Sequence, residues 1–522
     1  MGISVWVLAA LAVLGSASAA NVLVVVPTPA KSHHFLLERL ALDLAERGHR
    51  VTFVTSFRQP KPVKNLEEVI YPDYYKELMK SFTGVSGEPT LLDMHALGYI
   101  KSTFMLHKMG LAMTDMFLST QTIRDFIRSD RKYDLVIGEA FFIEAVLAGF
   151  SKKYDCPLIA LSTNFPSFYV NYMVGNPSPS AYIPSSVLGF SDDMTFIERT
   201  ANFLFETMTS VYFHSVYLPA QDSLMRKHFG NGLPPIEKIM TNTSLVLVNH
   251  HSALAAARPY LPNMVEIGGY HVRPPKPLPE ELKKFMDNSK NGVILFSMGS
   301  HAKSTQFPRE KQKMFVSVFA KLKQNVLWKF EDDSLTDLPD NLKIMKWVPQ
   351  SDVLAHPNIK LFITHGGLLS TTEALSRGVP LLGLPIFGDQ PYNMAAVERS
   401  GFGKKLSLQD LDETVLYNTI TEMLSNKAYK ETAMRKSVHL NDRLMPPAET
   451  AVFWIEYVIR HKGAPHMRCA AVDLEWYELY LIDVFAVIAV AVFLAGWLAC
   501  RCTRAVCRAI CCRKPAKKRK TN

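Results

Sequence analysis

Hydrophobic residues in the N-terminal part of this chain gather into short runs separated by a stretch with helical spacing. A run of valines and leucines covers 22–26, leucines then recur three and four positions apart within 36–44, and a second run covers 50–55. Ser32 suits the capping position at the start of the helix, and Gly48 suits its end. This pattern predicts a strand, a helix and a second strand, as in one unit of a parallel sheet.

The C-terminal half repeats this order. An apolar run at 360–364 leads into a glycine pair, a helical stretch follows at 368–377, and a further run occupies 381–384. The same reasoning predicts other strands and helices, at 134–137, 142–152, 157–161, 292–298, 326–330 and 446–461. Alternating strands and helices in both halves indicate the α/β class, with two separate sheets.

Two apolar segments lie outside this pattern. Within residues 1–20, an apolar core at 5–14 precedes Ala17-Ser18-Ala19, which is typical of a cleavable signal peptide. The segment 481–499 is apolar except for Asp483 and would span about 28 Å as a helix, enough to cross a bilayer. We therefore predict a single membrane span, with the basic tail 500–522 in the cytosol and the folded part on the other side.

The distribution of charge and cysteines argues against nucleic-acid binding and against a cysteine metal site. The net charge is +10, but residues 501–522 hold nine Lys or Arg and no acid, which leaves about +1 for the rest. The positive charge therefore belongs to the tail and gives no reason to expect nucleic-acid binding. Five of the seven cysteines also lie in the tail. Cys156 and Cys469 remain, and they either pair or stay free; their spacing fits no metal site.

The glycine pair after the run 360–364 indicates an anion site. His365-Gly366-Gly367 sits between a strand and a helix, where backbone N–H groups and a helix N-terminus face the carboxyl end of a sheet. Glycines let the main chain approach a phosphate closely. A second junction of this kind, Gly299-Ser300, follows the strand 292–298, and Lys329 ends another strand where a basic group could face phosphate.

Side chains around this junction suit the rest of a nucleotide sugar. Glu373, Asp389 and Gln390 could hydrogen-bond hydroxyl groups, while Trp347 and Gln350 could stack on a base and read its edge. We read the pair of acids at Asp410-Leu411-Asp412 as a helix cap rather than as a metal-binding motif, since no strand precedes it. We therefore expect no metal and no cofactor.

In the first half, His33 lies at the junction of the first strand and helix, beyond the carboxyl end of the strand, where ligands bind in such sheets. Neutral histidine is the commonest general base at physiological pH. His34 and His49 are interpreted as structural.

The spacing from Phe362 through Asp389-Gln390 closely resembles the signature of the UDP-glycosyltransferases, and Ser32-His33 with Arg47-Gly48-His49 resembles the start of their first domain. This likeness covers nearly all of residues 22–500. It implies the GT-B fold, an α/β architecture of two Rossmann-like domains facing a cleft, followed here by a C-terminal transmembrane helix. The expected boundaries are 1–20 signal peptide, 21–272 acceptor domain, 273–285 linker, 286–445 UDP-sugar domain, 446–470 return helix, 481–499 membrane helix and 500–522 tail.

The resemblance also assigns roles. His33 would be the base, and Glu139 would orient it, although vertebrate relatives have aspartate there; Glu144 is the rival partner. Alternatively, Glu139 is a helix N-terminal acid. Donor contacts are implied for Ser300, Lys329, Trp347, Gln350, His365, Gly366, Gly367, Ser370, Glu373, Asp389 and Gln390. The family asparagine beside Ser370 is Leu369 here. Segments 80–122 and 165–217, rich in Met, Phe and Tyr, resemble the acceptor region, with core packing as the alternative.

These features predict an inverting transferase that moves a hexose, by its arthropod-like pattern glucose, from a UDP-sugar to a hydroxyl of small lipophilic acceptors. Glucuronic acid is the alternative sugar. A silent UDP-sugar-binding subunit and a ceramide glycosyltransferase are the alternative functions. Lysines near the end of the tail resemble an endoplasmic reticulum retrieval signal, so the expected site is the membrane of that compartment with lumenal catalytic domains. Asn242 begins the glycosylation sequon. Homo- and hetero-oligomers both stay open.

Overall fold

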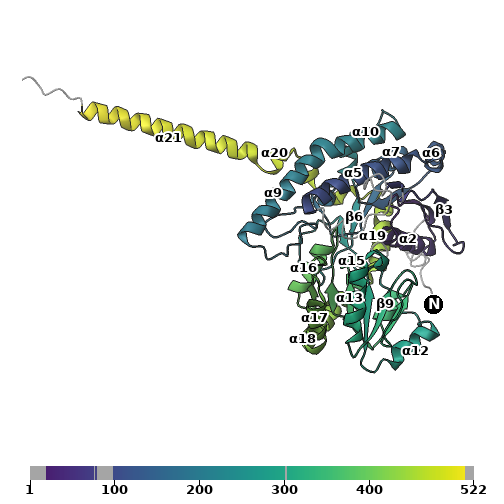
Figure 1. The fold of residues 1–522 in the computed structure, drawn as a ribbon. Helices are drawn as coiled ribbons and strands as arrows, with labels where there is room; N and C mark the ends of the chain where they lie inside the picture. Colours follow the sequence, from purple (N-terminus) through teal and green to yellow (C-terminus); the bar gives the residue numbers. More distant parts are fainter. Residues whose placement is uncertain (1–18, 76, 79–97, 300–302, 512–522) are drawn as a thin grey trace, which may run out of the picture. The chain divides into compact units, whose positions relative to one another are not determined.

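A computed structural model describes residues 19–75, 77–78, 98–299 and 303–511, which contain two separate parallel sheets (Figure 1). The strand order of the first sheet is β3-β2-β1-β4-β5-β6-β7, and that of the second is β10-β9-β8-β11-β12-β13. The predicted two-sheet α/β fold is confirmed. We call the part around the first sheet the first lobe and the part around the second sheet the second lobe.

The first sheet consists of β1 (Asn21–Val25), β2 (Arg50–Thr55), β3 (Leu66–Ile70), β4 (Leu135–Glu139), β5 (Leu158–Ser162), β6 (Leu245–Val248) and β7 (Met264–Glu266). The helical segments of this lobe are α2 (Lys31–Glu46), α5 (Gly98–Ser119), α6 (Gln121–Arg128), α7 (Glu144–Lys153), α8 (Phe168–Tyr172), α9 (Phe196–Tyr212), the π-helical η1 (Phe213–Tyr217), α10 (Leu218–Phe229) and α11 (Ile236–Met240).

The second sheet consists of β8 (Val293–Ser297), β9 (Asn325–Lys329), β10 (Leu342–Met345), β11 (Ile359–Thr364), β12 (Leu381–Gly383) and β13 (Gly403–Lys405). Its helical segments are α12 (Glu280–Asn288), η2 (Ser304–Gln306), α13 (Arg309–Ala320), α14 (Gln350–Leu354), α15 (Leu368–Ser376), α16 (Gln390–Arg399), α17 (Glu413–Ser425) and α18 (Lys427–Asn441), followed by α19 (Pro447–Arg460) and η3 (Pro465–Met467). Asp412 accepts a hydrogen bond from Val415 N at 2.8 Å and caps α17, which confirms its predicted capping role.

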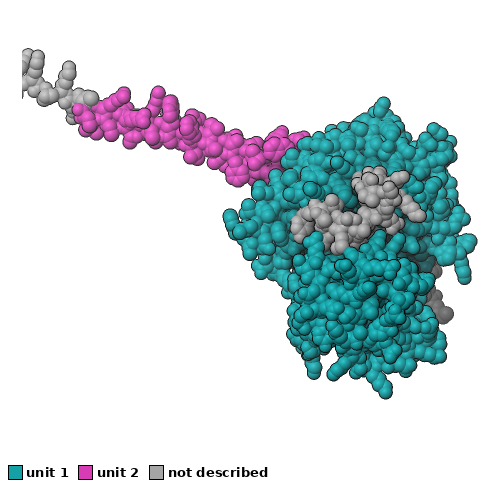
Figure 2. Space-filling model, viewed as in Figure 1, with its two compact units in different colours: residues 1–468 teal, residues 469–522 magenta. Residues whose placement is uncertain are grey.

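Residues 1–468 form one compact unit and residues 469–522 form a second (Figure 2). The domain boundary drawn at 273–285 therefore stays a prediction. The described part of the second unit contains η4 (Ala470–Asp473), α20 (Trp476–Leu479) and α21 (Ile482–Cys511). Helix α21 is long and apolar enough to cross a membrane and includes nearly all of the predicted span 481–499.

Each sheet has a switch point, the place where the order of its strands reverses, and the strand order gives its position. In the first sheet β1 lies between β2 and β4, with Val22 opposite Val51 on one side and Leu135 on the other. In the second sheet β8 lies between β9 and β11. The order reverses beside β1 and beside β8, and ligands of such sheets bind beyond the carboxyl ends of the strands at these points.

Strand β1 forms because its valines and leucine are buried on both faces of the sheet, as expected for an inner parallel strand. The leucines of α2 at 36, 37, 40 and 44 pack beneath it, as their spacing predicts. The prediction that Ser32 caps α2 is wrong. The helix begins at Lys31 after Ala30, whose backbone is extended and whose carbonyl accepts from His34 N at 2.9 Å, so Ser32 already lies in the first turn.

Helix α19 returns from the second lobe to pack on the first sheet, as predicted. Its residues Ala451, Val452, Ile455 and Val458 belong to the same buried cluster as β1 and α2. At the edge of this contact, Glu456 accepts from Arg47 Nε at 3.3 Å and lies 3.4 Å from Nε2 of the buried His49. The Arg-Gly-His sequence after α2 thus anchors the return helix.

Replacing Ile455, which is fully buried, with alanine should destabilise the protein through the cavity that it leaves. Substitutions of this kind cost about 2–5 kcal/mol of the free energy of unfolding. The measurement is the apparent Tm of the full chain in detergent. Phe453→Ala on the same helix is the control, because Phe453 is exposed. An Ile455→Ala protein as stable as this control would contradict the packing described.

Candidate active site

His33 and Glu139 meet at the switch point of the first sheet. His33 lies in the first turn of α2 just after β1, and Glu139 is the last residue of the neighbouring strand β4. Nδ1 of His33 contacts Oε1 of Glu139. The side chain of Glu139 is fully buried, whereas that of His33 keeps 17% of its surface exposed. The imidazole is therefore held from behind by a carboxylate and remains open to solvent on its other side.

Two threonines hold the carboxylate of Glu139 in place. Thr28 Oγ1 donates to Oε2 at 2.8 Å, and Thr163 Oγ1 donates to Oε1 at 2.7 Å. Neither threonine is predicted from the sequence. The available signal is their position, since Thr28 follows β1 and Thr163 follows β5, so both lie at the carboxyl edge of the sheet.

The electrostatics of the site favour a protonated His33. Burial is the largest influence and lowers the pKa of the imidazole, but the charge and hydrogen bond of Glu139, with the charge of Asp389, outweigh it and raise the pKa above its ordinary 6.5. With the Nδ1 proton directed at Glu139, the neutral ring has its lone pair on Nε2. This arrangement suits a base that takes a proton at Nε2.

Among the described residues, Glu144 forms no hydrogen bond or ion pair with His33. It begins α7, its side chain is buried, and burial raises its pKa to about 7. The alternative in which Glu139 is a helix N-terminal acid is wrong, because Glu139 ends a strand and α7 begins five residues later. Aromatic side chains lie beside the histidine, and one of them contacts Tyr169 of the predicted acceptor segment 165–217 through its neighbour Phe142. The Phe141 ring is 4.6 Å from that of His33, and Phe142 is 4.9 Å from Tyr169. Met113, in contrast, is 1% exposed and belongs to the core.

In the second lobe, His365 is enclosed by two glycines. A Cβ atom on Gly299 would lie 2.6 Å from Cε1 of the His365 ring, and one on Gly367 would lie 2.6 Å from Nε2. Gly366, which separates His365 from Gly367, has a φ of +82°, a backbone conformation that residues with a side chain rarely adopt. Gly367 is the N-cap residue of α15. The strand ends at β8 and β11 thus bring the predicted Gly299 and His365 junctions together at the second switch point, beside a helix N-terminus.

Gln350, Ser370 and Glu373 form one hydrogen-bonded group. Nε2 of Gln350 donates to Ser370 Oγ at 3.0 Å and to Glu373 Oε2 at 2.6 Å. Burial raises the pKa of Glu373 to about 7, so this acid is partly protonated near neutral pH. Trp347, three residues before Gln350, has 66% of its surface exposed. The predicted contacts of Trp347 and Gln350 with a base stay a prediction.

Asp389 and Gln390 lie at the start of α16. Gln390 Oε1 accepts from Ile386 N at 2.8 Å and Phe387 N at 3.2 Å, so this oxygen shapes the preceding turn. Asp389 Oδ2 accepts from Asn393 Nδ2 at 2.8 Å, and burial raises the pKa of Asp389. The charge of Asp389 in the second lobe contributes to the raised pKa of His33 in the first, which indicates an electrostatic interaction between the two lobes.

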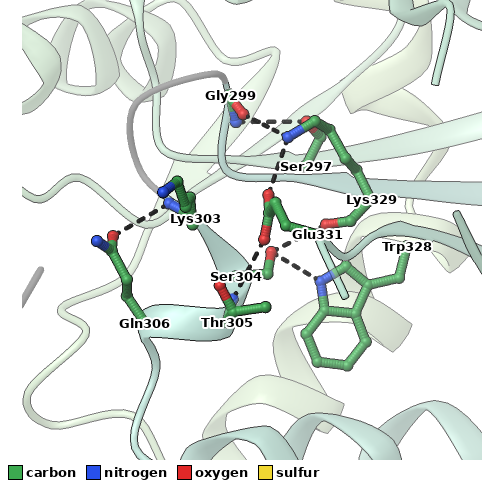
Figure 3. Close-up of polar contacts among 9 residues, drawn as sticks. All are labelled: Ser297, Gly299, Lys303, Ser304, Thr305, Gln306, Trp328, Lys329 and Glu331. Carbon is green, nitrogen blue, oxygen red and sulfur yellow. Dashed lines mark hydrogen bonds and ion pairs between the residues drawn. The ribbon is translucent and has the colours of Figure 1, made fainter. Parts of the chain in front are cut away.

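The side-chain amine of Lys329 interacts with other residues of the second lobe (Figure 3). Its Nζ donates to Gly299 O at 2.9 Å and pairs with Glu331 Oε1 at 2.9 Å, while Glu331 Oε2 accepts from Thr305 N at 3.2 Å. The lysine therefore holds the Gly299 turn against His365. Ser300, the predicted phosphate contact in that turn, lies outside the described residues.

The remaining predicted positions lie away from these groups. Asn242 is exposed just after α11. Cys156 and Cys469 are free thiols. Within the residues that the structure describes, no three His, Cys, Asp or Glu side chains are grouped as metal ligands would be.

Comparison with known proteins identifies similarity to a single family. A profile described as UDP-glucoronosyl and UDP-glucosyl transferase matches residues 20–519. UDP-glycosyltransferase UGT5 of Dactylopius coccus is 37% identical over 473 residues, which cover 89% of this chain and 88% of the relative. UDP-glucuronosyltransferase 2C1 of Oryctolagus cuniculus is 36% identical over 515 residues, 94% of this chain and 98% of the relative.

Solved structures agree at the level of the fold. The crystal structure of CalG4, the calicheamicin glycosyltransferase, matches with a TM-score of 0.57 at 19% identity and covers 85% of this chain and 99% of that one. The glycotransferase of kitacinnamycin matches with a TM-score of 0.56 at 18% identity, covering 84% and 99%. The architecture is thus the two-lobed GT-B fold of glycosyltransferases.

Gly367→Ala tests the enclosed histidine. The backbone of Gly367, with φ −62° and ψ 141°, accepts alanine, so the main effect is the clash of Cβ with the His365 ring. Displacement of the ring should weaken binding of UDP by about tenfold or more, which is ~1.4 kcal/mol. Isothermal titration of the full chain in detergent measures this. Gly232→Ala, where Cβ would meet nothing within 4 Å, is the matched control, and equal affinity in both variants would contradict the arrangement.

Proposed function

Since the chain belongs to the family of UDP-glucuronosyl- and UDP-glucosyltransferases, we propose that it transfers a hexose, with inversion, from a UDP-sugar to a hydroxyl of small lipophilic acceptors. That it is a UDP-sugar hexosyltransferase follows from the family. The observation that carries the finer proposal is the contact of His33 Nδ1 with the buried Glu139, which leaves Nε2 as the ring nitrogen that can accept a proton.

The proposed reaction uses His33 as a general base. An alcohol or phenol is a poor nucleophile at neutral pH, so its proton passes to Nε2 of His33 as the oxygen attacks the anomeric carbon. Glu139 stabilises the imidazolium that forms, and Thr28 and Thr163 keep the carboxylate in position. The new bond joins the acceptor oxygen to the sugar, and the bond from the sugar to the β-phosphate breaks. Attack from the face opposite UDP inverts the anomeric carbon.

The leaving group takes the electron pair and departs as UDP. The amides at Gly366 and Gly367, the N-terminus of α15 and the enclosed His365 are the groups proposed to stabilise its developing charge. Asp389 and Gln390 would bind hydroxyls of the sugar, and Glu373 would bind the ribose. Trp347 and Gln350 would hold the uracil, and Ser300 and Ser370 would contact phosphate. In this proposal Lys329 acts through the Gly299 turn, because its Nζ is already engaged.

Glucose is the proposed sugar. UDP-glucosyltransferase 2 of Dactylopius coccus is 36% identical over 92% of this chain, and the Glu-Ala-Phe-Phe sequence at 139–142 resembles arthropod members. The aromatic side chains beside His33 support a lipophilic acceptor. The proposed location is the endoplasmic reticulum membrane, with α21 as the single span, the catalytic part in the lumen and Asn242 available for glycosylation.

His33→Ala should lose at least about 100-fold in turnover, the typical contribution of a general base, while binding UDP as tightly as the wild type. The assay follows UDP release and product formation with one phenol, offered UDP-glucose and UDP-glucuronate separately. Glucose should transfer faster. His439→Ala on α18 is the control, since His439 is exposed on the second lobe. Retained turnover in His33→Ala would reject the base assignment, and UDP release without any acceptor product would reject transfer.

The pH dependence of the transfer rate tests the pairing of Glu139 with His33. Because His33 must be neutral to act, the rate should rise with pH through an apparent pKa above 6.5. In Glu139→Gln the amide no longer stabilises the imidazolium, so this pKa falls, the acidic limb moves to lower pH, and the maximal rate falls by about tenfold or more. Glu144→Gln, at a residue with no hydrogen bond or ion pair to His33 in the described part of the chain, should leave the limb in place. A limb that stays fixed in Glu139→Gln would contradict the pairing.

A further inference from the structure

Helix α9 presents its apolar side outward. Six large apolar residues on it are between 37% and 78% exposed, namely Phe196, Ile197, Phe203, Leu204, Met208 and Val211. They recur three, four and seven positions apart and so share one side of the helix, together with Thr200, Ala201 and Thr207. We call this side the apolar stripe; none of its nine described residues is charged. Figure 1 shows α9 at the periphery of the first lobe.

The opposite side of α9 is buried and mixed in character, with the polar Asn202 and Thr209 beside Phe205, whereas an ordinary surface helix buries its apolar side. Asn202 is fully buried and makes three hydrogen bonds, donating to Ser180 O at 2.8 Å and Ile183 O at 3.0 Å and accepting from Ser185 N at 2.8 Å. Thr209 is also buried and donates to Phe205 O at 2.8 Å. The three bonds of Asn202 reach residues outside the helix and so fix its rotation, and the stripe cannot turn inward without losing them.

The apolar stripe is more stable when an apolar surface covers it than when it faces water. Burying a Phe, Leu or Ile side chain that was exposed to water gains roughly 1.5–3 kcal/mol, and this helix leaves several of them exposed. Contiguous exposed apolar patches on soluble proteins mark binding surfaces for proteins or membranes. Phe, Leu and Ile thus gather on one side of α9, and its three charged residues, Glu198, Arg199 and Glu206, lie outside that side.

We propose that the apolar stripe of α9 docks on the surface of a lipid bilayer. This proposal rests on the proposed location of the chain, in which α21, a helix long and apolar enough to cross a membrane, keeps the folded part close to a bilayer. Only the segment 469–481 separates the first compact unit from α21, and it reaches at most about 45 Å. Tethering at such range makes even a weak surface contact effective.

The dimensions of α9 indicate that it lies in the interface rather than crossing it. Its 17 residues are about 26 Å long, shorter than the hydrocarbon core of about 30 Å. Both of its ends also continue into the folded lobe, through Thr195 and through η1. The stripe would therefore sink only to the level of the headgroups and upper acyl chains.

A second copy of the chain is a poorer occupant. One side of a helix of this length offers about 300 Å², from a length of ~26 Å and a width of ~10 Å. A stable protein interface needs about 800 Å² from each partner. The stripe alone is thus too small for a dimer, whereas a bilayer accepts a single helix face.

Depth-dependent quenching of tryptophan fluorescence tests the proposal. Phe203→Trp and Leu204→Trp place a reporter in the stripe, and Val438→Trp places one at an exposed apolar position on α18 of the second lobe. Each full-length variant is reconstituted, one chain per nanodisc, in phosphatidylcholine with or without bromine on the acyl chains. The fluorescence added over the wild type is measured, and UDP binding by each variant verifies that it is folded.

The stripe reporters should lose most of their added fluorescence to bromine near the headgroup end of the acyl chains and less to bromine near the chain ends. The Val438→Trp reporter should stay unquenched. Stripe reporters as insensitive to bromine as Val438→Trp would overturn the proposal. If they respond instead to raised protein concentration in detergent, a second copy occupies the stripe and the proposal is again overturned.

Discussion

The contact between His33 and Glu139 is the constraint on which the rest of the site depends. A carboxylate with no exposed surface is tolerated only because it is paired and hydrogen-bonded, and here an imidazole and two threonine hydroxyls supply those partners. All four groups come from the carboxyl edge of three adjacent strands, β1, β4 and β5. The parallel sheet thus positions all four groups, although they come from a strand end, a helix and two loops.

The second lobe uses the same topology for a different task. Its switch point brings Gly299 and His365 together, and the missing Cβ atoms of two glycines let the histidine ring lie between the main-chain segments. The lobes are joined by direct contacts as well as by α19. His271 Nε2 donates to Leu369 O at 3.1 Å, and Arg443 Nη2 donates to Gly268 O at 2.6 Å. These contacts join the lobe that carries His33, the proposed base, to the lobe that carries the proposed anion site at Gly366 and Gly367.

Much of this arrangement could be predicted from the sequence, because it rests on local patterns. Buried valine runs give the strands, and His33 and the His365 glycine pair stand at strand ends. The partners of these residues could not be predicted, because they depend on side-chain geometry. Thr28 and Thr163 are ordinary loop threonines until the sheet brings them to Glu139. Lys329 ends a strand as expected, but only the fold reveals Glu331 and Gly299 O as its partners.

The most direct test of the account is a structure of the full chain with UDP and an unreactive acceptor analogue. With His33 as the base, the acceptor oxygen should lie within hydrogen-bond reach of Nε2, about 2.6–3.2 Å, and the β-phosphate should lie at the amides of Gly366 and Gly367. An acceptor oxygen that faces another base, or a diphosphate bound away from α15, would contradict it.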